Sequence, residues 1–133
     1  MTIIKTLVPS ANRIGFLPQH FGLHAAMLVE PNIYAQLGSL CKAYDGGLWH
    51  FYELDNGGCF MAPNSDKPFH LENPDNDSSE TMSAEAAGIV ACLYTFSLLS
   101  FRPGMEPLGD KYHQLREFAL EHPECANIFA LID

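Results

Sequence analysis

The chain is poor in basic side chains. Its 133 residues include seven lysines and arginines against sixteen aspartates and glutamates, a formal net charge of −9. The basic residues are also scattered singly along the sequence. Because proteins that bind the phosphate backbone usually carry a basic patch, direct nucleic-acid binding is not expected. The charge is compatible with a basic partner, or with the DNA-binding face of another protein.

The motifs of common catalytic and metal sites are also missing. The sequence has no glycine-rich phosphate loop, no nucleophile elbow and no His-Glu-x-x-His zinc motif. Its four cysteines form no Cys-x-x-Cys pair, which favours buried thiols. His20 and His24 are four residues apart, but no third ligand is near in sequence. We therefore predict no metal, no cofactor and no catalytic set.

No apolar run is long enough to cross a membrane easily. The longest uncharged stretch, residues 86–101, is too short and contains glycine, threonine and serine. The first ten residues lack the pattern of a signal-peptide cleavage site. These features predict a cytoplasmic protein that does not contact membranes, and the length predicts a single domain over residues 1–133.

The most informative stretch is residues 48–63, where two aromatic-rich runs flank Asn56-Gly57. This pattern predicts a β-hairpin with a two-residue type I′ turn, which pairs Leu54 with Cys59 and Tyr52 with Met61. Side chains on both faces are apolar, so the hairpin should be covered on both sides. Residues 67–71 are predicted to add a short third strand at its edge.

The remaining elements follow from hydrophobic spacing and from capping residues. Helices are predicted from Glu30-Pro31 to about Cys41, over 84–100 with Ser83 as N-cap, over 110–122, and from Pro123 onwards. Residues 2–8 are a predicted short strand, 13–22 a loop, and 72–80 a mobile acidic surface loop. The prediction is an α+β fold, with a small antiparallel sheet of about three strands packed with about four helices.

Four stretches carry a resemblance to a known family. They are the hairpin, from Trp49-His50-Phe51-Tyr52-Glu53-Leu54 through Asn56-Gly57-Gly58 to Met61-Ala62-Pro63, and three segments in the same order: residues 16–22, residues 82–92, and residues 111–113 through 122–124. Together they resemble the antirestriction family ArdB/KlcA across nearly the whole chain. Cys59 departs from the family, in which an aromatic residue is often found at this position.

The resemblance implies a small α+β protein, encoded on plasmids and other mobile elements, that inhibits type I restriction-modification enzymes and so protects incoming DNA. It implies no cofactor and supplies no catalytic residues. We therefore expect a non-enzymatic inhibitor that contacts a protein partner, either a type I restriction enzyme or an associated host factor. The oligomeric state is left open, with a monomer as the simpler expectation.

Acidic residues are the candidate partner contacts: Glu72, Asp75, Asp77, Glu80 and Asp133. The alternative is that they are plain solvated surface. Full DNA mimicry is disfavoured, because a chain of this size is roughly 36 Å across and DNA of that length carries roughly 21 charges. A partial mimic that uses the four residues of the 72–80 loop stays open.

A second alternative is an enzyme that modifies a restriction component through a thiol or a histidine. On the predicted hairpin, Cys59 and His50 share a face, but their separation of roughly 13 Å is too large for a hydrogen bond. A Cys59 nucleophile would therefore need His20, His24 or His113 as its base.

Overall fold

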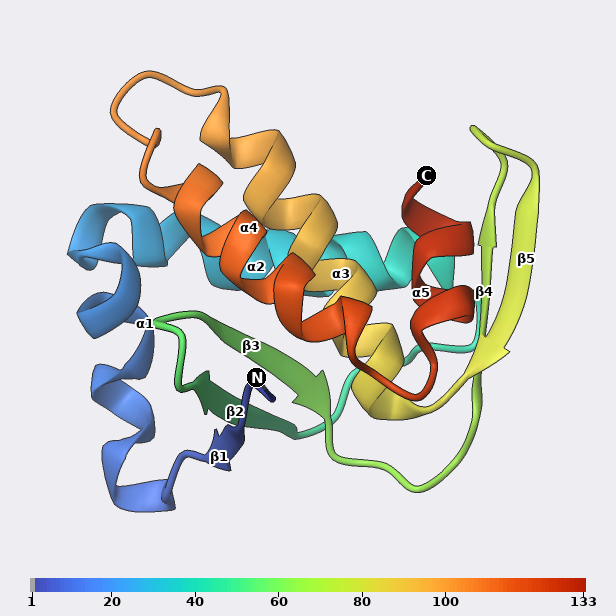
Figure 1. Ribbon diagram of the computed structural model, residues 1–133, viewed down its shortest axis with the longest axis horizontal. Helices are drawn as coiled ribbons and strands as arrows, with labels where there is room; N and C mark the ends of the chain where they lie inside the picture. The colour runs from blue at the N-terminus through green and yellow to red at the C-terminus, as the bar shows by residue number, and fades with distance from the viewer. Residues whose placement is uncertain (1) are drawn as a thin grey trace.

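The computed structural model describes residues 2–133 (Figure 1). Over these residues it contains five α-helices and two small antiparallel sheets, which confirms the predicted α+β class. In chain order the elements are β1 (Lys5–Leu7), a 3-10 helix (Ser10–Asn12), α1 (Arg13–Phe21), α2 (Leu23–Leu40), β2 (Trp49–Leu54), β3 (Cys59–Pro63), β4 (Phe69–Asn73), β5 (Ser78–Met82), α3 (Ala84–Ser100), α4 (Leu108–Leu120) and α5 (Cys125–Ile132).

The hairpin of β2 and β3 is confirmed, but its predicted register is wrong by one residue. Tyr52 pairs with Phe60 rather than with Met61. The loop has three residues, because the Gly57 N–H donates to the Leu54 carbonyl and Gly57 takes a φ of 92°. A turn followed by a left-handed glycine adds one residue to the loop. The extra residue exchanges the two faces of β3 relative to β2.

The third strand of this sheet is β1, not residues 67–71, so that prediction is wrong. Strand β4 pairs instead with β5 in a second sheet. Residues 72–80 are therefore part of an ordered hairpin and not a mobile loop. The reason is Asn73, which is only 5% exposed and whose side-chain amide donates to the Leu131 carbonyl of α5 at 2.8 Å.

Tertiary packing also makes the N-terminal part of the chain more helical than predicted. Residues 13–22 were expected to be a loop, yet they form α1, in which the ring of Phe16 stacks on Phe51 at 5.0 Å. Helix α2 begins at Leu23 rather than at Glu30, and Pro31 lies inside it. The break between the two helices is Gly22, which has a φ of 80°. The helical spacing of buried residues before and after Pro31 accounts for the longer α2.

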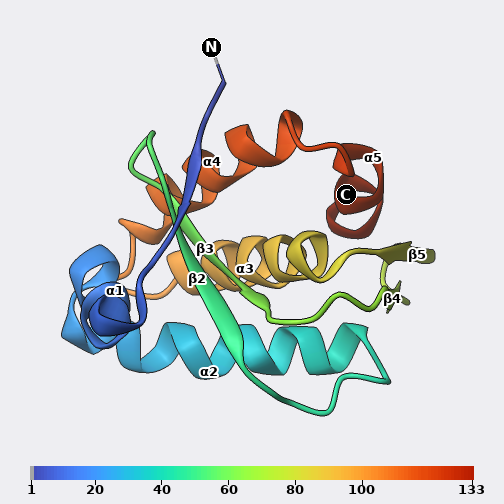
Figure 2. The same ribbon diagram turned by 90° about the horizontal axis from the view of Figure 1, so that it is seen from below.

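Helix α3 runs through the middle of the molecule, with α2 on one side and α4 on the other (Figure 2). Its predicted N-cap is confirmed, since the Ser83 hydroxyl accepts the Ala86 N–H at 3.1 Å.

Helix α3 also contacts the free edge of β3. Residues that bond to β2 alternate along β3 with residues that face outward, so the N–H and C=O groups of Met61 point away from β2. The Cys92 thiol meets both of these groups, 3.4 Å from the nitrogen and 3.6 Å from the oxygen. Thus α3 covers the outer edge of β3.

This close contact needs a glycine. A Cβ atom at Gly88 would lie 2.4 Å from the Met61 oxygen and 2.5 Å from the Ala62 Cα. Both are main-chain atoms, so neither can move aside like the end of a flexible side chain.

Replacing Gly88 with alanine is therefore expected to lower the free energy of unfolding by ~3 kcal/mol, through overpacking against the strand. The matched control is Gly109→Ala on α4, where the new Cβ meets no atom within 4 Å. That control should leave stability unchanged or raise it by up to about 1 kcal/mol. Urea unfolding of both variants measures the difference, and equal stabilities would refute the proposed close contact.

Candidate functional site

Two of the regions predicted to contact a partner lie together in the structure. Asp75 and Asp77 are in the exposed turn between β4 and β5, and Asp133 follows α5. Burial raises the pKa of Tyr94, and the neighbouring carboxylates of Asp75 and Asp133 raise it further. The Asn76 amide joins the turn to the end of α5 by donating to the Leu131 carbonyl at 3.1 Å. We call Asp75, Asp77 and Asp133 the acidic corner.

The other two predicted residues are not part of this corner. Glu72 and Glu80 lie on opposite faces of the β4–β5 hairpin, because Glu72 pairs with Ser79 and the two strands are in register. A Glu72 oxygen lies 3.5 Å from His70 Nε2. Glu80 is half-buried, and its carboxylate accepts a hydrogen bond from Asn127 at 3.3 Å. Both side chains therefore also have contacts within the fold.

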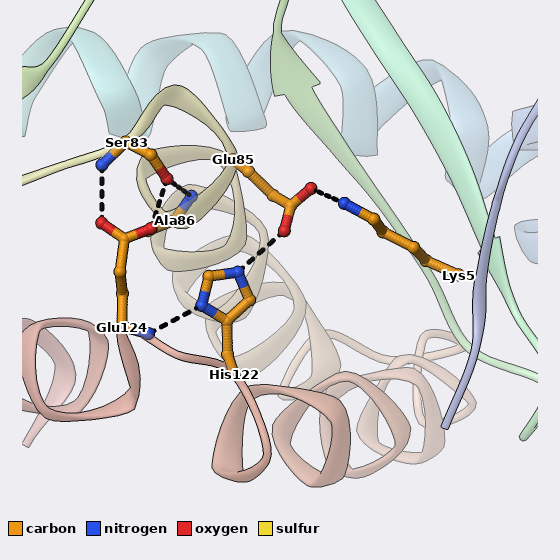
Figure 3. Close-up of polar contacts among 6 residues, drawn as sticks. All are labelled: Lys5, Ser83, Glu85, Ala86, His122 and Glu124. Atoms are coloured by element: carbon orange, nitrogen blue, oxygen red, sulfur yellow. Dashed lines mark hydrogen bonds and ion pairs between the residues drawn. The ribbon is translucent and has the colours of Figure 1, made fainter. Parts of the chain in front are cut away.

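A polar cluster joins β1, the start of α3 and the turn between α4 and α5 (Figure 3). The Glu85 carboxylate is at its centre and pairs with the Lys5 ammonium and with His122 Nε2, the latter at 2.7 Å. His122 Nδ1 accepts the Glu124 N–H at 3.0 Å, so the ring proton is on Nε2 and is donated to Glu85.

Glu124 completes this cluster. Its carboxylate accepts the Ser83 main-chain N–H at 2.8 Å and also the Ser83 hydroxyl (Figure 3). The residue before α5 thus ties that helix to the N-cap of α3. The Ser83 hydroxyl donates to a carboxylate and not to a histidine, which is not the arrangement of a serine nucleophile with its base. The geometry is that of a clamp between three segments.

A second polar cluster joins α1, the β2–β3 turn and α4. Lys111 Nζ lies 3.1 Å from His20 Nδ1 and donates to the Gly57 carbonyl at 2.8 Å. His20 Nε2 lies 3.7 Å from a Glu53 oxygen. Burial and the Lys111 charge lower the pKa of His20, while Glu53 opposes them. His20 is therefore neutral at physiological pH and bridges segments that are distant in sequence.

Sequence reasoning missed both clusters, because residues in direct contact within them are as many as 91 positions apart in the chain. The signal that could have found them is the resemblance itself. Residues of all four quoted stretches meet here: 16–22 and the hairpin with 111–113 in one cluster, and 82–92 with 122–124 in the other. The structure brings them together as supports of the fold.

The thiol alternative is not supported by the environment of Cys59. Its side chain is 1% exposed, and burial raises the pKa of its thiol. The corrected register also places His50 opposite Ala62, on the other face of the hairpin from Cys59. Cys92 is fully enclosed as well, and burial raises its pKa to about 12. Both thiols therefore stay protonated and out of reach of a large substrate.

Across residues 2–133, no group of three histidine, cysteine or acidic residues is arranged to hold a metal ion. The same described part of the chain has no helix that combines the length and the apolar character needed to cross a membrane.

Comparison with known proteins decides the family. A family model described as "Antirestriction protein" matches residues 42–133. The chain belongs to the antirestriction protein family. The resemblance seen in the sequence is thereby confirmed.

Full-length relatives from Escherichia coli agree with this assignment. The antirestriction protein KlcA is 41% identical over 137 residues, which cover 98% of this chain and 94% of KlcA. The uncharacterized protein YafX of strain K12 is 43% identical over 131 residues, 96% of this chain and 86% of its own. The putative antirestriction protein YubI of the same strain is 33% identical, with 95% and 93% coverage.

A solved structure of the antirestriction family shares the whole fold. It superposes with a TM-score of 0.93 at 39% identity and covers 100% of this chain and 96% of its own. The description of this structure states that KlcA and ArdB show a novel fold and antirestriction activity against Type I DNA restriction systems in vivo but not in vitro. The family fold therefore includes β1, α1 and α2, which precede the segment matched by the family model.

The Glu85 contacts predict a pH dependence of stability. The hydrogen bond from His122 and the ion pair with Lys5 hold the pKa of Glu85 below its ordinary 4.5, against the effect of burial. A carboxyl with a lowered folded-state pKa stabilises the fold above its unfolded-state pKa, and this stabilisation is lost as the pH falls through the folded-state value. The contribution is thus present at pH 7 and disappears below about pH 4.5.

Glu85→Gln should therefore lower the free energy of unfolding at pH 7 by about 1–2 kcal/mol, the usual cost of losing charge-assisted hydrogen bonds. The deficit relative to the wild type should shrink as the pH falls below 4.5, the ordinary glutamate pKa. Urea unfolding at several pH values measures it, with the exposed Glu117→Gln as control. A deficit that does not vary with pH would contradict the assigned role.

Proposed function

We propose that this antirestriction protein protects incoming mobile-element DNA from type I restriction-modification enzymes in the bacterial cytoplasm. The observation that carries the proposal is the match to the KlcA/ArdB structure over the entire chain, at 39% identity. We infer that all of residues 1–133 act as one antirestriction domain, because β1 pairs with β2 across the start of the family-model match.

The proposed mechanism is contact with a protein partner, without catalysis. Two observations support it. The polar side chains of both clusters already hydrogen-bond or pair with other parts of the chain, and the Cys59 thiol is buried and protonated. The net charge of −9 also opposes direct DNA binding. A monomer is the proposed active form, because two copies with this charge repel each other.

The partner we favour is a host factor on which the restriction enzyme depends. The related proteins act in vivo but not in vitro, as expected when a component of the cell is missing from the purified reaction. Direct contact with the restriction enzyme is the alternative within this proposal. Full DNA mimicry is disfavoured, since sixteen carboxylates, some of them held in internal contacts, cannot reproduce a duplex of the same length.

For the contact surface we propose the acidic corner. Asp75 and Asp77 are exposed at the tip of a hairpin, and the hydrogen bonds of Asn73 and Asn76 to α5 hold this tip beside Asp133. Carboxylates fixed on an ordered turn meet a basic patch without paying the entropy of ordering a loop. Glu72 and Glu80 would contribute to the same acidic field from the flanking strands.

Changing the three corner aspartates to asparagine should lower protection of unmodified plasmid or phage DNA in restricting cells by on the order of tenfold, which corresponds to ~1.4 kcal/mol of binding. The fold should survive, because asparagine tolerates the positive φ of 55° found at Asp77. The control carries Asp45→Asn, Asp66→Asn and Asp110→Asn, which remove the same charge elsewhere on the exposed surface. Equal protection by the two triple variants would exclude the acidic corner.

A further inference from the structure

The outer edge of β1 has main-chain groups that pair with nothing in the described chain. The Val8 N–H donates to Phe51, and the Asp55 N–H donates to Ile4. Because ladder bonds alternate along an antiparallel strand, residues 4, 6 and 8 face β2. The N–H and C=O groups of Lys5 and Leu7 therefore point outward. All three residues of β1 are exposed.

The opposite edge of the same sheet shows the contrast. There, α3 lies against β3, and the Cys92 thiol meets the outward groups of Met61. One edge of the sheet is thus closed by a helix, while the β1 edge is open along the described chain. An open strand edge is a template for another strand, because its donors and acceptors repeat at the spacing of an extended chain.

A hollow of about 420 Å³ lies beside this open edge. Its apolar lining includes Ile3, Phe118 and Pro123, and its acidic lining comprises Glu85, Glu121 and Glu124. Lys5 has its side chain on the same face of the sheet as Tyr52, and it lines the hollow too. A residue placed opposite Lys5 on an added strand would project to this same face.

The charges of the hollow favour a cation. Among residues 2–133, three carboxylates and one lysine, Lys5, line it. Glu121 accepts the Ile3 N–H with one oxygen, and its second oxygen makes no hydrogen bond within residues 2–133. A lysine or arginine has an aliphatic stem suited to Phe118 and Pro123, and a charged head suited to Glu121.

We propose that β1 is a docking edge to which an extended, basic segment of a partner protein adds as a fourth strand, with a lysine or arginine side chain in the hollow. The inference rests on the proposed function in that it supplies a contact of the protein partner. Main-chain pairing selects an extended segment over a helix, whose own main-chain groups are already bonded. The acidic lining selects a basic segment over nucleic acid or a second copy of this acidic chain.

The test uses a capped seven-residue peptide of alternating threonine and valine with one central arginine, titrated into 15N-labelled full-length protein. We expect saturable amide shifts at Lys5, Leu7 and Glu121, with a dissociation constant of about 1 mM or below. A control peptide with glutamate at its centre should bind at least about tenfold more weakly. Absence of saturable shifts, or shifts that map away from β1, would overturn the proposal.

Two variants with matched controls separate the main-chain and the charge contributions. Leu7→Pro removes one outward N–H and blocks the edge, yet it leaves the bonds to β2 intact, whereas Leu7→Val retains the N–H. Glu121→Gln removes one of the three negative charges that line the hollow, and Asp110→Asn removes an exposed charge at the other end of α4. Leu7→Pro and Glu121→Gln should each weaken peptide binding several-fold, and the controls should not; equal effects would refute the docking edge.

The same variants are assayed for protection in restricting cells and for dimerisation by sedimentation. We expect Leu7→Pro to lose protection at wild-type stability, with Leu7→Val active. A wild-type dimer that Leu7→Pro abolishes would show that the edge binds a second copy, which would overturn the proposed occupant. Failure of the wild type itself to protect cells would refute the antirestriction role, while the peptide titration still decides whether the edge binds an extended basic segment.

Discussion

The contact between α3 and the outer edge of β3 is the constraint on which the rest of this structure depends. The edge of the three-stranded sheet at β3 has main-chain groups that need partners, and here a helix covers it. Gly88 lets the helix backbone approach the strand, and Cys92 satisfies main-chain groups that would otherwise have no partner. Because α2, α4 and α5 all pack on the same helix, the sheet and the helices share one core.

The two polar clusters hold the ends of this arrangement in place. Glu85 and His122 join β1 to the start of α3 and to the α4–α5 turn, whereas His20 and Lys111 join α1 to the hairpin turn and α4. These groups resemble the components of a catalytic site, but their hydrogen bonds are used within the fold. Their role is to orient strands, helices and turns that are distant in the sequence.

These polar groups make contacts inside the fold, and the two surfaces proposed to bind a partner lie at the exterior. The acidic corner presents carboxylates on an ordered turn, and the β1 edge presents main-chain groups beside an acidic hollow. Both suit a basic protein partner, and both agree with the excess of carboxylates over basic side chains. Association with such a partner is the mechanism that we propose for this antirestriction protein.

Local signals in the sequence were enough for the α+β class, the β2–β3 hairpin, the N-cap at Ser83, the helices near the C-terminus and the family. They failed where distant residues decide the outcome. The hairpin register depends on a three-residue turn whose Asn56 side chain bonds to the Gln114 carbonyl of α4. Residues 72–80 are ordered because Asn73 and Asn76 bind carbonyls of α5.

The candidate site shows the same difference between what local sequence signals indicate and what contacts between distant residues decide. The sequence alone indicated acidic residues and a terminal aspartate as separate candidates, because charge and polarity can be read locally. Their assembly into one corner, the two polar clusters and the open edge of β1 were decided only by the tertiary structure. The physical reason is that hydrogen bonds and ion pairs are short-ranged, so a site made from segments tens of residues apart exists only once the chain has folded.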